Sequence, residues 1–106
     1  MISNARRLEP EERKLQLLRH AVAMAEIVGY SNLTCTGVAS SAGLRSHAIV
    51  NYYFGSVKNL KKEVFNYALK NKNLEIILQS LIRRDTFSTK IPSDLRQQAL
   101  TKFSNE

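Results

Sequence analysis

Three glycines, Gly29, Gly43 and Gly55, divide the first half of this 106-residue chain into short segments. Glycine ends helices readily because it adopts positive φ angles at little steric cost. The segments between these glycines carry apolar residues at helical spacing. We therefore predict an all-α fold in which short helices are joined by tight turns.

The first segment is predicted to form a helix over residues 10–28. Pro10 suits the first turn of a helix, and the acidic residues that follow it complement the positive end of the helix dipole. The expected apolar face consists of Leu15, Leu18, Val22 and Ala25. Residues 1–9, which include Arg6 and Arg7, lack apolar periodicity and are predicted to form a flexible basic arm.

Two short helices are predicted to follow. Thr34 is a good N-cap for the first of them, and Cys35 is expected to be a small core residue within it. The second is predicted to run over about residues 46–53, with Ile49 and Phe54 facing inward.

A longer apolar stripe comes next, in the alternating steps of four and three that are typical of a heptad seam. Its members are Leu60, Val64, Tyr67, Asn71, Leu74, Leu78 and Leu81. Polar residues at 70–73 interrupt the stripe and leave two interpretations. Either one helix runs from 57 to about 84 with Asn71 buried, or two helices meet near residues 71–73.

After this region the sequence becomes less periodic. Residues 86–92 are predicted to form a loop, and Ser93 is expected to cap a last short helix that ends near Phe103. The predicted organisation is thus a three-helix region, a fourth helix that is long or broken, and a short C-terminal helix.

Short helices joined by a glycine-containing turn are typical of a helix-turn-helix, predicted here between about Leu33 and Phe54. In this motif the second helix of the pair lies in the major groove of DNA, whose width accepts one helix. Small residues at positions 39, 42 and 43 allow the two helices to pack closely. Residues 10–57 are therefore the predicted DNA-binding region, and residues 58–106 form the C-terminal helices.

The same segment resembles the tetracycline-repressor (TetR) family of bacterial regulators over about residues 13–65. The matching motifs are Gly29-Tyr30, Thr34, Val38-Ala39-Ser40-Ser41-Ala42-Gly43-Leu44 and Asn51-Tyr52-Tyr53-Phe54-Gly55-Ser56-Val57-Lys58-Asn59-Leu60. The resemblance implies a helix-turn-helix that binds operator DNA. It also implies that Tyr52 matches the family's aromatic residue that bonds a backbone phosphate.

The sequence departs from the family pattern in three ways. The stretch between Gly43 and Asn51 is one residue longer than usual, and Val57 replaces the family's lysine, with Lys58 one position later. Only 46 residues follow Leu60, which is too few for the family's large ligand-binding and dimerisation domain. We therefore expect no small-molecule effector and no cofactor.

Candidate site residues follow from chemistry and position. Base contacts are assigned to Arg45, Ser46, His47 and Asn51, since Arg pairs with guanine and Asn with adenine. Phosphate contacts are assigned to Thr34, Thr36, Tyr52, Tyr53 and Lys58. Arg6 and Arg7 are expected to reach an adjacent minor groove. Plainer interpretations stay open: either tyrosine as a core aromatic, His47 as an ordinary surface residue, and Thr34 as a helix cap alone.

Charge and composition narrow the classes of function. Sixteen Lys and Arg against nine Asp and Glu give a net charge of +7, which favours a polyanion such as double-stranded DNA over an acidic protein or a membrane surface. The single cysteine excludes an internal disulfide and cannot form a metal site by itself. No catalytic constellation indicates an enzyme. No apolar run approaches the roughly 20 residues of a membrane span, and no secretory signal is present, so we expect a cytoplasmic protein.

The expected function is transcriptional regulation, as a repressor that binds a short palindromic operator. Binding two half-sites requires a homodimer, for which the expected contacts are Tyr67, Asn71, Leu74, Leu78 and Leu81. A regulator of this size would suit a phage or plasmid. The alternatives are a DNA-binding protein that serves replication, partition or packaging, and a protein-interaction factor such as an antirepressor.

Overall fold

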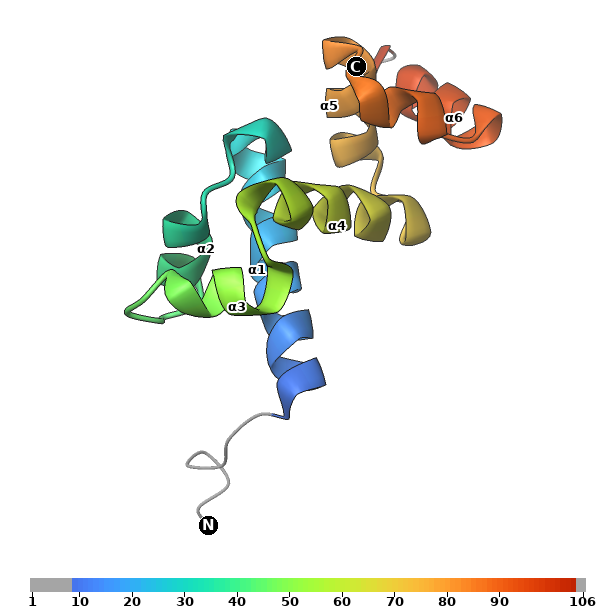
Figure 1. Ribbon diagram of the computed structural model, residues 1–106. Coiled ribbons are helices and arrows are strands. Elements are labelled where there is room, and N and C mark those ends of the chain that lie inside the picture. Colours follow the sequence, from blue (N-terminus) through green and yellow to red (C-terminus); the bar gives the residue numbers. More distant parts are fainter. Residues whose placement is uncertain (1–8, 105–106) are drawn as a thin grey trace.

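The computed structural model describes residues 9–104, and all regular structure within that range is helical (Figure 1). The elements in chain order, with η marking 3₁₀ helices, are α1 (Pro10–Val28), η2 (Tyr30–Asn32), α2 (Cys35–Ser41), α3 (Ala48–Phe54), α4 (Val57–Lys70), α5 (Leu74–Arg83), η3 (Thr86–Lys90) and α6 (Ser93–Ser104). The predicted all-α fold is confirmed.

The bounds of α1 agree with those predicted, and both ends are capped. The backbone N–H of Glu9 donates to Glu12 Oε1 at 2.9 Å, as part of a capping box. At the other end, Gly29 has a φ of 92°, and its N–H donates to Ala25 O at 2.9 Å. The glycine therefore ends α1 in a backbone conformation that other residues rarely adopt.

The buried face of α1 is displaced from the expected one. Val22 and Ala25 are buried as predicted and Leu18 packs half-buried against the core, but Leu15 is 38% exposed. Leu17 and Ala21 are fully buried instead. Helical spacing alone allows two neighbouring apolar stripes on this segment, and packing against the other helices selects the one that contains Leu17.

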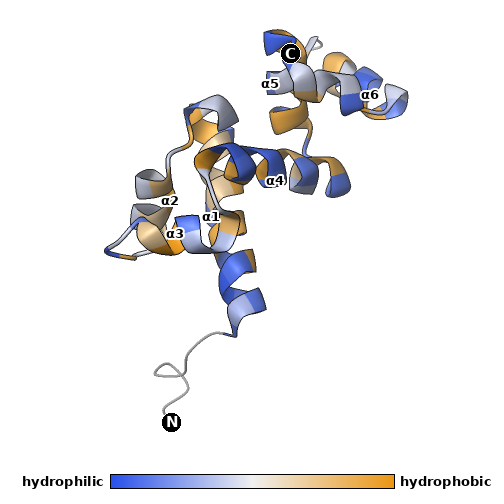
Figure 2. Ribbon diagram, in the orientation of Figure 1, coloured by the Kyte–Doolittle hydropathy of each residue, from blue (hydrophilic) through white to orange (hydrophobic). Residues whose placement is uncertain are grey.

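Helices α2, α3 and α4 pack with α1 around one apolar core, and hydrophilic and hydrophobic positions alternate along α4 in Figure 2. The core residues of these three helices are Val38, Ala39, Val50, Phe54, Leu60, Val64, Phe65 and Ala68. The prediction that Phe54 faces inward is correct. Val50, rather than Ile49, is the other fully buried residue of α3, because Ile49 is only half-buried.

The heptad stripe does not continue through one helix. α4 ends at Lys70 and α5 begins at Leu74, so the two-helix interpretation is correct. Asn71 is exposed rather than buried, and Lys72 adopts a left-handed φ of 55°. Asn73 then caps α5 by accepting from Ile76 N at 3.3 Å.

The C-terminal elements form a helical hairpin. α5 and α6 pack side by side, and their buried apolar residues are Ile76, Ile77, Leu95 and Ala99. The predicted loop at residues 86–92 is largely the 3₁₀ helix η3, because the side chain of Asp85 caps it by accepting from Phe87 N at 3.1 Å. Ser93 is the first residue of α6 rather than its cap.

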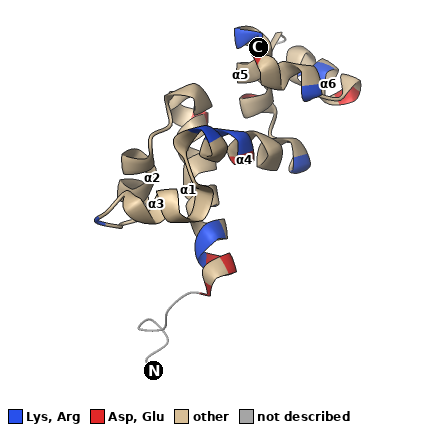
Figure 3. Ribbon diagram, viewed as in Figure 1, with Lys and Arg blue, Asp and Glu red and all other residues tan. Residues whose placement is uncertain are grey.

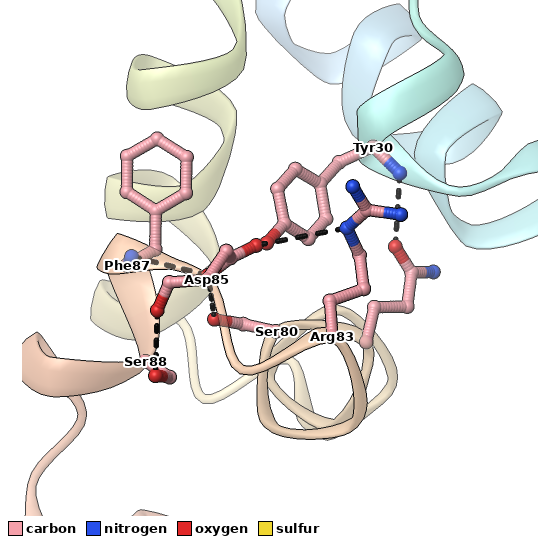
Figure 4. A network of polar contacts seen from close by, with 7 residues as sticks. Tyr30, Ser80, Arg83, Asp85, Phe87 and Ser88 are labelled. Carbon is pink, nitrogen blue, oxygen red and sulfur yellow. Dashed lines mark hydrogen bonds and ion pairs between the residues drawn. The ribbon is translucent and has the colours of Figure 1, made fainter.

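A polar network joins this hairpin to the end of α1 (Figure 4). The Tyr30 hydroxyl donates to Asp85 Oδ2, and Ser80 Oγ donates to Asp85 Oδ1 at 2.7 Å. Gln79 adds a second link, since its Oε1 accepts from Tyr30 N at 2.9 Å and its Nε2 donates to Ala25 O at 2.8 Å. Burial, reinforced by the Asp85 hydrogen bond, raises the pKa of Tyr30 from 10.0 to about 12.

Substitution of Tyr30 by Phe should reduce the free energy of unfolding by about 1–3 kcal/mol, because a hydrogen bond to a partly buried carboxylate is lost. The pH dependence should change as well. The folded protein holds the phenol proton more tightly than the unfolded chain, so this contribution is complete below pH 10 and is lost as the pH rises from 10 to about 12.

Urea unfolding at a series of pH values measures both effects. The matched control is Tyr52→Phe, which alters an exposed phenol. It should leave the stability and its alkaline decrease unchanged. Equal alkaline profiles for the wild type and Tyr30→Phe would contradict this role of the network.

Candidate nucleic-acid interface

The turn between α2 and α3 is a glycine-centred helix stop. Gly43 has a φ of 77°, and its N–H donates to Ser40 O at 3.0 Å. The N–H of Leu44 donates to Ala39 O at 2.8 Å, which completes the bond pattern of a Schellman motif. This pattern fixes how the chain leaves α2 and so where α3 begins.

α3 starts later than the sequence predicts, at Ala48 rather than about residue 46. Ser46 Oγ accepts from Ala48 N at 3.1 Å and so satisfies a backbone donor at the start of the helix. The turn from Gly43 to α3 therefore takes in residues 44–47. Three of the predicted base-contacting residues, Arg45, Ser46 and His47, belong to this turn and not to α3 itself.

One face of α3 points into the core and the opposite face points outward. Val50 and Phe54 are buried, whereas the exposed residues of the helix and its C-cap recur at positions three or four apart. These exposed residues are Ala48, Asn51, Tyr52 and Gly55. All four residues assigned to base contacts, namely Arg45, Ser46, His47 and Asn51, are exposed as well.

An open groove runs from the start of α2 to the start of α4 across α3. It is lined by Leu33, Thr34, Cys35, Asn51, Gly55, Ser56 and Val57. The groove brings one predicted phosphate contact, Thr34, next to one predicted base contact, Asn51. Cys35 Sγ donates to Asn51 Oδ1 at 3.4 Å, and burial raises the pKa of the Cys35 thiol.

The remaining predicted phosphate contacts differ in their surroundings. Tyr52 is 81% exposed, while Tyr53 is half-buried and packs against the core, with its ring edge-on to Tyr52 at 5.0 Å between centroids. Thr36 and Lys58 are exposed but are not among the residues that line the groove. Thr34 accepts from Gly37 N at 2.9 Å, so it caps α2 as expected.

The charged residues of the segment from α2 to Lys62 of α4 are all basic. No acidic residue lies between Glu26 and Glu63, whereas four basic residues do: Arg45, Lys58, Lys61 and Lys62. Figure 3 shows the absence of acidic colour on α2 and α3 and the basic positions along α4. This feature is readable directly from the sequence, and it removes the carboxylates that would repel a phosphate backbone.

The nearest acidic residue on α4 is paired. Glu63 Oε2 lies 3.3 Å from Lys14 Nζ, and the same Nζ lies 5.3 Å from the centre of the Phe54 ring. Lys14 therefore connects α1 with the last residue of α3 and with α4. It reduces the negative charge next to the helix-turn-helix and supports the orientation of α3.

The residues predicted for dimerisation do not form one continuous stripe, because Asn71 lies in the turn between α4 and α5 while the others lie on these two helices. Tyr67, Leu74, Leu78 and Leu81 are half-buried, and the Nδ2 of exposed Asn71 donates to Tyr67 O at 2.9 Å. An additional apolar residue beside them, Ile82, is 71% exposed. The seam pattern did not include Ile82, because it lies outside the four-and-three spacing.

The described part of the chain offers neither a metal-binding cluster nor a membrane-spanning helix. Between residues 9 and 104, His, Cys, Asp and Glu side chains form no cluster of three that would hold a metal ion. None of the helices in this range combines the length and apolar character needed to cross a membrane. The predicted minor-groove residues, Arg6 and Arg7, lie outside the described residues.

Comparison of the chain with models of known protein families, with curated protein sequences and with solved structures found no match.

Substitution of Gly43 by Ala should lower the free energy of unfolding by about 1–2 kcal/mol, because alanine is strained at a φ of 77°. No heavy atom lies within 4 Å of an added Cβ, so the cost is conformational and not a clash. Gly43→Asn should lower the free energy of unfolding by less, because asparagine tolerates this conformation better than alanine. Urea unfolding of both variants measures the difference, and equal losses would contradict a conformational origin.

Proposed function

We propose that this chain is a sequence-specific DNA-binding transcriptional repressor that places α3 in the major groove of a palindromic operator. The observation that carries the proposal is the outward face of α3. Its exposed residues, Asn51 and Tyr52 above all, stand opposite the buried Val50 and Phe54. A helix presented in this way fits the width of the major groove.

Charge supports the same interface. The helix-turn-helix carries Arg45 in its turn and Lys58 in the first turn of α4, with no acidic residue between Glu26 and Glu63. Arg45 can donate to both acceptors of a guanine edge, and Lys58 can neutralise a phosphate. The resemblance of residues 13–65 to the TetR family adds weight, because that family binds operator DNA through this pattern.

We propose in addition that the protein acts as a homodimer through α5 and the neighbouring end of α4. Leu74, Leu78 and Leu81 are half-buried in the single chain, and Ile82 is mostly exposed. Burying this apolar surface against a second copy would be favourable. A two-fold dimer would then present two α3 helices to half-sites about one helical turn apart.

The proposed dimer would repress transcription through the DNA that it covers. A dimer that covers two successive major grooves at a promoter excludes polymerase by occupying the same DNA. A protein that serves DNA packaging would share the helix-turn-helix but would show little sequence preference, whereas one that serves replication or partition would bind clustered repeats near an origin. The breadth of sequence preference and the position of the bound sites therefore separate these functions from repression.

Selection from a random pool of double-stranded DNA tests the proposed function. We expect an enriched palindrome, bound at least about a thousandfold more tightly than scrambled duplex at physiological salt. Uniform binding with a steep dependence on salt would instead indicate a structural DNA-binding protein. Absence of DNA binding would overturn the proposal and indicate a protein partner.

Two substitutions on α3 should separate base contacts from phosphate contacts. Asn51→Ala should weaken operator binding by about 1–3 kcal/mol and relax the preference at one base pair of each half-site. Tyr52→Phe should weaken binding to all sequences alike, since a phosphate contact carries no base information. Affinities for the operator and its single-base variants measure both effects. If neither substitution changed affinity or base preference, α3 would be excluded as the recognition helix.

A charged residue in the proposed dimer surface should dissociate the dimer. Ile82→Glu should give a monomer in sedimentation equilibrium at micromolar concentration, because a carboxylate would be buried at the interface. Ile27→Glu is the matched control, since Ile27 is also strongly exposed but lies on α1, and it should remain dimeric. A wild-type monomer, or dissociation by both variants alike, would contradict this interface.

A further inference from the structure

The leading residue on the outward face of α3 is Ala48, which sequence-based site assignment passes over because it carries no polar atom. Ala48 is exposed and lies three residues before Asn51 and four before Tyr52, so all three share one face. Of the exposed positions on this face, Gly55 has no side chain. The aromatic ring of Tyr52 adds apolar surface, but Ala48 is the one residue of this face whose side chain has no polar atom.

The backbone of Ala48 has little to offer a DNA base. Its N–H already donates to Ser46 Oγ at 3.1 Å. As the first residue of α3, it directs its carbonyl into the helix. The side-chain methyl group is what remains for a ligand. Ala48 directly follows the turn residue His47 and precedes Asn51 by three positions.

The major groove contains one apolar group among the four base pairs. Guanine, adenine and cytosine present hydrogen-bond donors and acceptors there, whereas thymine adds its C5 methyl group. A small side chain without polar atoms, placed beside the polar Asn51, is complementary to that methyl. Alanine also adds no bulk that would hold the helix away from the base edges.

We infer that Ala48 determines specificity by contacting the C5 methyl of one thymine in each operator half-site. The inference rests on the proposed function and deepens it, because it names the base that the start of α3 selects. Three residues along a helix correspond to about 4.5 Å, and successive base pairs are about 3.4 Å apart. The thymine thus lies one or two base pairs from the position that Asn51 contacts.

Replacement of thymine by deoxyuridine removes only the C5 methyl, and it tests the contact without altering the protein. Each thymine of the selected operator is replaced in turn, symmetrically in both half-sites, and the affinity is measured. We expect one position at which the wild type loses about fourfold per half-site, the value of one buried methyl group. That position should lie within two base pairs of the one relaxed by Asn51→Ala.

The same duplexes are then bound to three variants. Ala48→Gly removes the methyl and should bind the thymine and uracil operators equally. Ala48→Ser places a hydroxyl at the same point and should shrink the uracil effect, which keeps the test valid if the glycine variant folds poorly. Asn51→Ala is the matched control and should retain the uracil effect in full.

The outcomes separate this inference from the function on which it rests. An enriched operator that is insensitive to uracil at every thymine, or a uracil effect that persists in Ala48→Gly, overturns the role of Ala48 and leaves operator recognition intact. A chain that enriches no sequence overturns both. Loss of the uracil effect in the Ala48 variants alone, next to the Asn51 position, establishes the contact.

Discussion

The burial of Val50 and Phe54 fixes the direction in which α3 presents its other face, and the candidate interface depends on that constraint. Both residues belong to the core cluster that includes Leu17 of α1 and Leu60 of α4. A seven-residue helix is too short to be stable by itself, so its packing supplies the stability that its length does not. The orientation of the exposed residues is therefore a consequence of core packing.

The C-terminal hairpin is held to this unit through η2 and the end of α1. Tyr30 reaches Asp85 with its hydroxyl, and Gln79 bonds both to Tyr30 and to Ala25. Polar contacts of this kind depend on geometry, so they set the position of α5 relative to α1 more sharply than apolar packing alone. The direction in which the apolar side of α5 would face a second copy in the proposed dimer follows from these bonds.

Local signals in the sequence predict most of the helices. Pro10 and Gly29 bound α1, and Thr34 caps α2, because caps and helix stops act through neighbouring residues. The sequence did not predict which of two adjacent stripes of α1 is most deeply buried, or that Val50 is buried more fully than Ile49. Both depend on tertiary packing, which helical spacing does not resolve. In the candidate site, polar side chains such as Asn51 and Arg45 are recognisable by their chemistry, whereas Ala48 becomes visible only when the exposed face of α3 is known.

Chemical protection of the selected operator tests the placement of α3 most directly. Dimethyl sulfate methylates guanine at N7 in the major groove and adenine at N3 in the minor groove, so one reagent reports on both. With α3 in the major groove, the bound protein should protect guanine N7 atoms in two patches about one helical turn apart, and Asn51→Ala should weaken that protection. Full N7 reactivity in the complex, with protection confined to adenine N3, would show that the protein binds through the minor groove and that the outward face of α3 does not read the bases.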